Sequence, residues 1–113
     1  MLWWPDSQLR VPASYWWAMG EGDLKADIPL GDGDRIVLQR FDLRGPKTQE
    51  NLVRLRQDGT VVWRAEPPEP SAGDSWVAVE WVPDEGIFAN SWSCWRVRID
   101  PAAGNMISKE FTK

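Results

Sequence analysis

Short stretches in which apolar and polar residues alternate run through the last two thirds of the chain. In NLVRLR, residues 51–56, Val53 and Leu55 fall on one side, and Arg54 and Arg56 fall on the other. A period of two is the pattern of β-strands that bury one face. Stretches of this kind predict about seven strands, at residues 36–42, 51–56, 60–65, 76–82, 87–92, 95–100 and 106–112.

Turn sequences separate the predicted strands. Asp58-Gly59 predicts a tight hairpin, because glycine accepts the positive φ that such a turn needs. The proline-rich stretch EPPEPSAGD, residues 66–74, is unfit for a central strand and predicts a loop or crossover. Because the remaining links are short, we expect consecutive strands to pair in a mostly antiparallel meander. The sequence therefore predicts an all-β fold.

The first 35 residues do not follow this pattern. They carry two Trp-Trp pairs, and then the acidic stretch GEGDLKADIPLGDGD at residues 20–34. Its Asp32-Gly33-Asp34 segment lacks the ligand spacing of a calcium loop, so a solvated loop is predicted. We expect a single domain over residues 1–113, with a tryptophan-rich N-terminal arm and acidic loop at 1–35 and a β-meander at 36–113.

An internal repeat lies within the predicted meander. LVRLRQDGTVVWRAE at residues 52–66 and WRVRIDPAAGNMISKEF at 95–111 share an apolar-basic strand, a glycine-bearing turn at Gly59 or Gly104, and a second short strand. Gly59 and Gly104 are 45 residues apart, a spacing typical of the four-stranded blades of β-propellers. The sequence at about residues 50–112 resembles the repeat of quinoprotein-type β-propellers. The resemblance implies blade-like sheets and transfers no quinone or metal site.

Two such units are too few to close a propeller ring by themselves. Either blades from several chains assemble, or the chain forms a sheet or sandwich with the same kind of hairpins. The predicted fold is accordingly propeller-blade-like or a sandwich, with a two-fold internal repeat.

The composition weighs against catalysis. The chain is 42% hydrophobic and 27% charged, as expected of a globular domain, and it has no histidine. Histidine is the commonest general base and metal ligand. No phosphate-binding loop, dinucleotide fingerprint or nucleophile elbow occurs in the sequence. We therefore predict a protein that is not an enzyme and has no cofactor or metal, although loop carboxylates are present at Glu66, Glu69, Asp74, Asp84 and Glu85.

Charge and the single cysteine restrict the partners and the compartment. A net charge of -4 makes nucleic acid an unlikely partner, because its binding depends on neutralising phosphates. One cysteine excludes an internal disulfide, and no leader or membrane-spanning run is apparent, so a cytoplasmic protein without membrane contact is expected. Cys94 has no histidine to activate it and is expected to be a small buried apolar residue.

Nine tryptophans are more than a core of this size needs. Side chains alternate between the two faces of a strand. This alternation directs Trp63, Trp81 and Trp95 toward the core and Trp76 to the face opposite Trp81. Neighbouring tryptophans cannot both point inward from an extended segment, so we expect indole surface outside the core. The alternative is that the N-terminal segment packs over the sheet. Arg96 and Arg98 are polar companions that either stack on Trp92 or, as we expect, form a solvated face whose aliphatic stems cover it. The candidate partner-binding residues are Trp3, Trp4, Trp16, Trp17, Trp76, Trp92, Arg96 and Arg98.

The function predicted from these features is that of a small, soluble, non-enzymatic interaction protein. Its tryptophan surface would serve self-association into a homo-oligomer or the binding of another protein. Two alternatives remain open. One is an immunity-type inhibitor, in which acidic surface charge neutralises a basic toxin. The other is a carbohydrate- or ligand-binding module.

Overall fold

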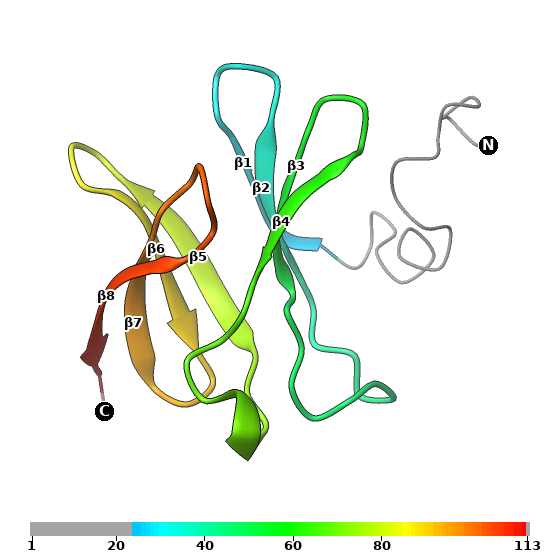
Figure 1. Cartoon of the computed structure of the whole chain (residues 1–113), viewed down its shortest axis with the longest axis vertical. Coiled ribbons are helices and arrows are strands. Elements are labelled where there is room, and N and C mark those ends of the chain that lie inside the picture. Colours follow the sequence, from blue (N-terminus) through cyan, green and yellow to red (C-terminus); the bar gives the residue numbers. More distant parts are fainter. Residues whose placement is uncertain (1–23, 113) are drawn as a thin grey trace.

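A computed structural model describes residues 24–112, which form two four-stranded sheets (Figure 1). In each sheet the strands pair antiparallel in chain order. The predicted tryptophan-rich arm, up to residue 23, lies outside the described residues. The first sheet (sheet A) contains β1 (Leu24–Pro29), β2 (Arg35–Gln39), β3 (Leu52–Leu55) and β4 (Val61–Ala65). The second (sheet B) contains β5 (Trp76–Val82), β6 (Gly86–Ser91), β7 (Trp95–Ile99) and β8 (Met106–Phe111), and a short 3-10 turn, η3 (Pro70–Ala72), lies in the connection.

The prediction of an all-β antiparallel fold is confirmed, and each of the seven predicted strands overlaps one of β2 to β8. The predicted acidic loop is wrong at residues 24–29, which form β1. Leu24, Ala26 and Ile28 alternate with more exposed residues along this strand. Asp27 on its outer side forms an ion pair with Arg35 of β2 at 2.6 Å. Because β1 is an edge strand, it tolerates the aspartate and the proline that made the sequence look like a loop.

The main core lies between the two sheets. Strand β5 of sheet B lies against β1 and β2 of sheet A. The shared cluster takes residues from every strand of sheet A and all but the last strand of sheet B, including Ile36, Leu38, Leu52, Trp63, Trp76, Ile87, Val97 and Ile99. Burial of these branched and aromatic side chains is the main source of stability for a small β-domain.

The two halves of the internal repeat occupy corresponding places in the two sheets. The hairpins β3–β4 and β7–β8 both carry a register shift, between Arg54 and Leu55 in one and between Arg98 and Ile99 in the other. The repeat seen in the sequence is therefore a repeat of hairpin geometry, bulge included.

Corresponding faces of the two sheets do not meet each other. When the two hairpins are aligned at their register shifts, Leu52 of sheet A corresponds to Arg96 of sheet B. Leu52 packs in the shared core, whereas Arg96 lies on the far side of sheet B. Val97 of sheet B packs in the shared core, whereas its counterpart Val53 belongs to a second cluster with Val37 and Leu55. The face of sheet A that meets sheet B therefore corresponds to the far face of sheet B, so the two sheets are stacked front to back.

Polar contacts near both ends of the interface help to hold the sheets together. Near one end, Arg54 Nη1 and Trp63 Nε1 donate hydrogen bonds to the same carbonyl oxygen, that of Pro101, at 2.6 and 2.8 Å. Near the other end, the Asn51 side chain donates to the Trp76 carbonyl and accepts from the Trp76 N–H, both at 2.8 Å. Asn51 therefore extends the hydrogen bonding of sheet A to the first residue of sheet B.

Gly104 permits a close approach between the two sheets. It lies in the β7–β8 turn with φ +80°, and a Cβ built on it would be 2.4 Å from Trp63 Cδ2. Gly104→Ala is expected to lower the free energy of unfolding by about 2–4 kcal/mol, from overpacking added to left-handed strain. Urea unfolding of Gly31→Ala provides the control, because Gly31 has φ +86° and open space around it. Equal losses in the two variants would contradict the role given to the Trp63 contact.

Candidate functional site

The loop carboxylates lie in two connections: Glu66, Glu69 and Asp74 between β4 and β5, and Asp84 and Glu85 between β5 and β6. Asp74, the buried one, accepts hydrogen bonds at Oδ1 from the backbone N–H groups of Ser75 and Ser93, at 2.9 and 3.0 Å. Its Oδ2 accepts from the Glu69 N–H at 3.0 Å and from the Ser93 hydroxyl at 2.6 Å. This carboxylate therefore fixes the loop between the sheets. Among residues 24–112, no group of three or more acidic or cysteine side chains is placed to hold a metal ion.

The expectation that Trp76 contributes exposed indole surface is wrong. Trp76 is only 1% exposed, and its Nε1 donates to the Ala65 carbonyl at 2.9 Å. The prediction placed Trp76 opposite Trp81 by assuming strict alternation along the strand. That assumption fails because the pairing of β5 with β6 shifts between Trp76 and Ala78. A bulge of this kind turns the residues before it to the other face of the strand.

Two further burial predictions are wrong. Trp81 was expected to lie in the core, but it is 53% exposed. It pairs with Ile87 as the strand phase requires, yet it lies next to the β5–β6 turn, where no second layer of residues 24–112 covers it. Cys94 is exposed rather than buried, because it lies in the β6–β7 turn with φ +72° and not within a strand.

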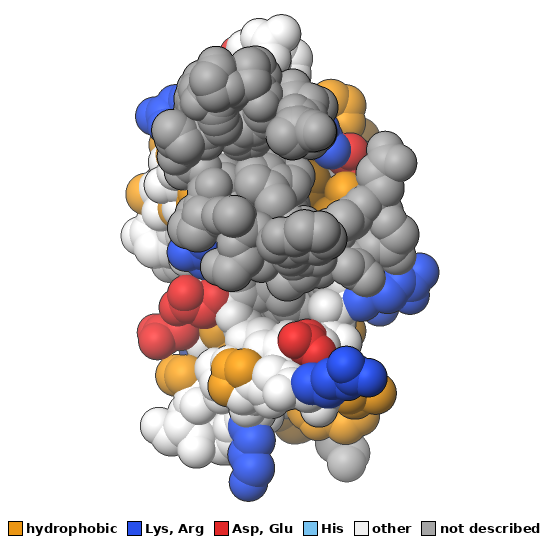
Figure 2. Space-filling model, turned by 90° about the vertical axis from the view of Figure 1, so that its right-hand side faces the viewer, with side chains coloured by type: hydrophobic (Ala, Val, Ile, Leu, Met, Phe, Trp, Pro, Cys, Tyr) orange, Lys and Arg blue, Asp and Glu red, His pale blue; other side chains and the backbone are white. Residues whose placement is uncertain are grey.

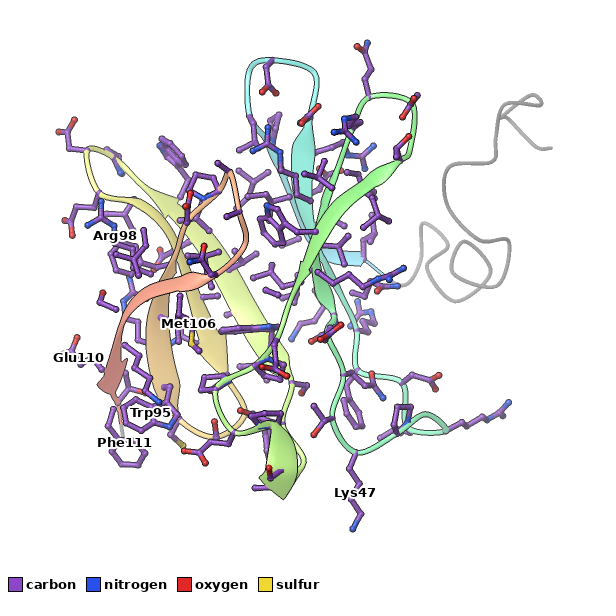
Figure 3. All side chains as sticks on the ribbon, in the orientation of Figure 1. Lys47, Trp95, Arg98, Met106, Glu110 and Phe111 are labelled. Atoms are coloured by element: carbon purple, nitrogen blue, oxygen red, sulfur yellow. The ribbon has the colours of Figure 1, made fainter. Side chains whose placement is uncertain are left out.

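The structure separates the candidate residues near the β6–β7 turn. Trp92 lies in the turn and is 72% exposed. Arg96 points to the far face of sheet B, where it pairs with Glu80 at 2.8 Å and lies 4.7 Å from the Phe88 ring centre. Arg96 therefore stacks on Phe88 and not on Trp92. Arg98 is exposed near the opposite end of sheet B from Trp95 and Phe111 (Figure 3). Trp3, Trp4, Trp16 and Trp17 lie outside the described residues.

Large exposed hydrophobic side chains gather in two groups on the described part of the chain. One group surrounds the loops at the end of the molecule where the β2–β3 and β6–β7 connections meet, and contains Phe41, Leu43 and Trp92. The other belongs to sheet B and contains Trp81 of β5 with Met106, Ile107 and Phe111 of β8. On the side shown in Figure 2, hydrophobic side chains lie among basic and acidic ones on the lower part of the molecule, where Figure 1 places the β2–β3 loop.

The first group borders a groove of about 500 Å³, here termed the loop groove, formed by Phe41, Leu43, Lys47, Val77, Trp92 and the loop at residues 72–75. Leu43 is 90% exposed, so its side chain is almost wholly available for contact. Lys47 extends from the rim into solvent (Figure 3). The surroundings are thus mainly apolar, with one cationic side chain at the border.

Phe41 and Leu43 were missed as candidates. The sequence predicts a strand through residue 42, but β2 ends at Gln39, and both residues belong to the following loop. The available signal was the segment FDLRGPK, residues 41–47, where two apolar side chains precede Gly-Pro. Apolar residues inside a turn-forming segment have no strand face to bury them.

Strand β8 forms the second surface. All six of its residues are exposed. Lys109 Nζ lies 4.4 Å from the Trp95 ring centre, and Phe111 meets the same ring edge-on at 5.3 Å (Figure 3). An exposed edge strand offers unpaired backbone groups to another strand. β8 is therefore a second place where a polypeptide can attach.

No helix within residues 24–112 is long and apolar enough to cross a membrane. No curated protein and no solved structure matches the chain. One family model matches at residues 31–111, a span that begins after β1 and includes β2 to β8. This span is well over half of the chain and contains both exposed apolar groups. The chain belongs to the family described as domain of unknown function (DUF7957).

Proposed function

We propose that the chain is a non-enzymatic protein-binding module and that the loop groove is its contact site. The observation that carries the proposal is the gathering of Phe41, Leu43 and Trp92, all exposed, around one apolar groove. Contiguous exposed apolar surface rimmed by polar residues is a mark of interaction sites. Tryptophan in such a position is typical of residues that dominate binding energy.

The chemistry of the groove indicates the segment that it would accept. Its apolar lining favours an aliphatic or aromatic side chain, and Lys47 at the rim favours a neighbouring carboxylate on the partner. Because the lining comes from three loops and the start of β5, the partner would contact loops of both sheets at once.

Self-association is the second candidate, and the exposure of β8 favours it. Another copy of the chain could add its own β8 to this open edge. Stacking through the far face of sheet B is less favourable, because that face carries Glu80, Arg96, Arg98 and Glu110. A polar outer face is the usual feature of a terminal unit in a stacked array.

The resemblance to propeller repeats remains part of the proposal. The front-to-back stacking of two sheets with matching bulged hairpins supports it, since neighbouring units in repeat proteins meet through unlike faces. The charged far face of sheet B weighs against closing a ring through that sheet.

The proposal predicts that loop-groove variants lose partner binding. Leu43→Ser and Trp92→Ala should each weaken partner capture from the source cell by at least about thirtyfold in Kd, the effect of a hot-spot residue. Trp81→Ala is the matched control, because it removes another exposed indole away from the groove. Quantitative pull-down of the tagged full chain measures the effect. If the Trp81 variant loses capture and the groove variants keep it, the loop groove is not the contact site.

A further inference from the structure

A second pocket lies at the opposite end of sheet B from the loop groove. It has a volume of about 430 Å³ and is lined by Trp81, Asp84, Glu85, Arg98 and Ile107, together with the start of the β7–β8 turn. Asp84 and Glu85 belong to the β5–β6 turn, whereas Trp92 of the loop groove follows β6 at its other end. This pocket, here termed the end pocket, is therefore a separate site.

One wall of the end pocket is apolar and open. Trp81 and Ile107 both line it and are 53% and 54% exposed. Trp81 lies at the end of β5, and Ile107 is the extra residue at the β7–β8 register shift. A half-exposed indole presents a flat face on which the apolar face of a ligand can rest.

The polar side chains of the end pocket have hydrogen-bonding capacity left. Within residues 24–112, Asp84, Glu85 and Arg98 take part in no side-chain hydrogen bond or ion pair, in contrast to Arg54 and Arg96. A Cβ built on Gly86 would be 4.0 Å from Arg98 Nε, an ordinary contact distance. The guanidinium therefore lies beside the β5–β6 turn that carries Asp84 and Glu85.

Charges of both signs in one small pocket restrict the ligand. An anion attracted by Arg98 would meet the carboxylates of Asp84 and Glu85, and a cation attracted by the carboxylates would meet the guanidinium. A neutral ligand escapes both repulsions. If it carries hydroxyl groups, these can donate to the carboxylates and accept from the guanidinium.

We propose that the end pocket binds a neutral saccharide, with one sugar ring stacked on Trp81 and its hydroxyl groups bonded to Asp84, Glu85 and Arg98. A pyranose ring combines an apolar face of C–H groups with hydroxyl groups at its edge, which is the combination that this pocket offers. The volume is within the usual range for small-ligand sites. This site is independent of the protein contact proposed for the loop groove.

The test follows the indole N–H signal of Trp81 by NMR in the full chain. The signal is assigned from a Trp81→Phe variant. The probes are the methyl glycosides of glucose, galactose, mannose and N-acetylglucosamine at tens of millimolar, followed by an array of neutral oligosaccharides. The expected result is a saturable shift of the Trp81 signal with at least one neutral sugar. Trp81→Ala should abolish binding, and Arg98→Gln or Glu85→Gln should weaken it about tenfold, the loss of one or two hydrogen bonds.

Trp92→Ala is the control variant, because it removes an exposed tryptophan from the opposite end of the sheet and should leave sugar binding unchanged. All variants are checked for unchanged urea midpoints. The proposal is overturned if no neutral sugar binds, if only acidic saccharides bind, or if Trp81→Ala binds as well as the unmodified chain. Loss of protein capture by the loop-groove variants would not affect these outcomes, so the two proposals fail separately.

Discussion

Replacing Trp76 with alanine is expected to lower the free energy of unfolding by about 3–5 kcal/mol, the usual cost of deleting a buried large aromatic side chain. The indole is almost completely buried in the cluster between the sheets. Small domains have a total stability of roughly 5–15 kcal/mol, so this loss would remove a large part of it. The variant should therefore unfold at much lower urea concentration, as followed by circular dichroism and tryptophan fluorescence.

Trp76→Phe separates the hydrogen bond of the indole from its volume. Phenylalanine keeps most of the apolar contact but leaves the Ala65 carbonyl without its donor. We expect a loss of about 1–3 kcal/mol, the cost of an unsatisfied buried acceptor. Trp92→Ala is the control for the alanine variant, and it should change the free energy of unfolding by no more than about 0.5 kcal/mol. Similar losses at positions 76 and 92 would contradict the burial described for Trp76.

Asp74→Ala is expected to destabilise the protein by about 3 kcal/mol or more. The carboxylate accepts four hydrogen bonds, from Ser75, Glu69 and twice from Ser93. Its removal leaves these donors inside the loop without an acceptor, and each unsatisfied buried donor costs about 1–3 kcal/mol where water cannot replace the lost partner. Urea unfolding measures the change, and amide hydrogen exchange should show loss of protection at Ser75 and Ser93.

Asp74→Asn provides a variant of equal size. Its amide group retains one acceptor oxygen but turns an N–H donor toward other donors, so the loss should be smaller than for alanine but clear. Glu50→Ala, at an exposed position in the same region, should be close to neutral. A neutral Asp74→Ala variant would show that the loop does not depend on this carboxylate.

The strands could be predicted because their signal is local. Alternation along β3 and glycine at the β3–β4 turn suffice to place a hairpin there, and the structure has it. The same holds for β7 and β8, whose turn contains Gly104. β1 also alternates, but its aspartate and proline are typical of a loop, and the local sequence does not show that the strand lies at a sheet edge.

Burial was harder to predict, because it depends on what lies over a residue. Trp76 turns inward through a bulge, which changes strand phase without a recognisable sequence signal. Trp81 points to the predicted face of its strand and is still exposed. The alternation along a strand shows which face a side chain is on, but not whether other residues cover that face. The loop groove needs residues from segments about fifty positions apart, Phe41 and Trp92 among them, and no single stretch of sequence shows that they meet.

The hydrogen bonds of Asp74 also have an entropic consequence for binding. Residues 72–75 form part of the loop groove, and Asp74 ties this segment to the β6–β7 turn that carries Trp92. The conformational freedom of both loops is therefore lost when the chain folds and not when a ligand arrives. Ordering of loops at an interface weakens affinity, so a groove preorganised in this way keeps more of its contact energy. If the loop groove binds a partner as proposed, the buried Asp74 carboxylate contributes to the affinity by ordering both loops beforehand.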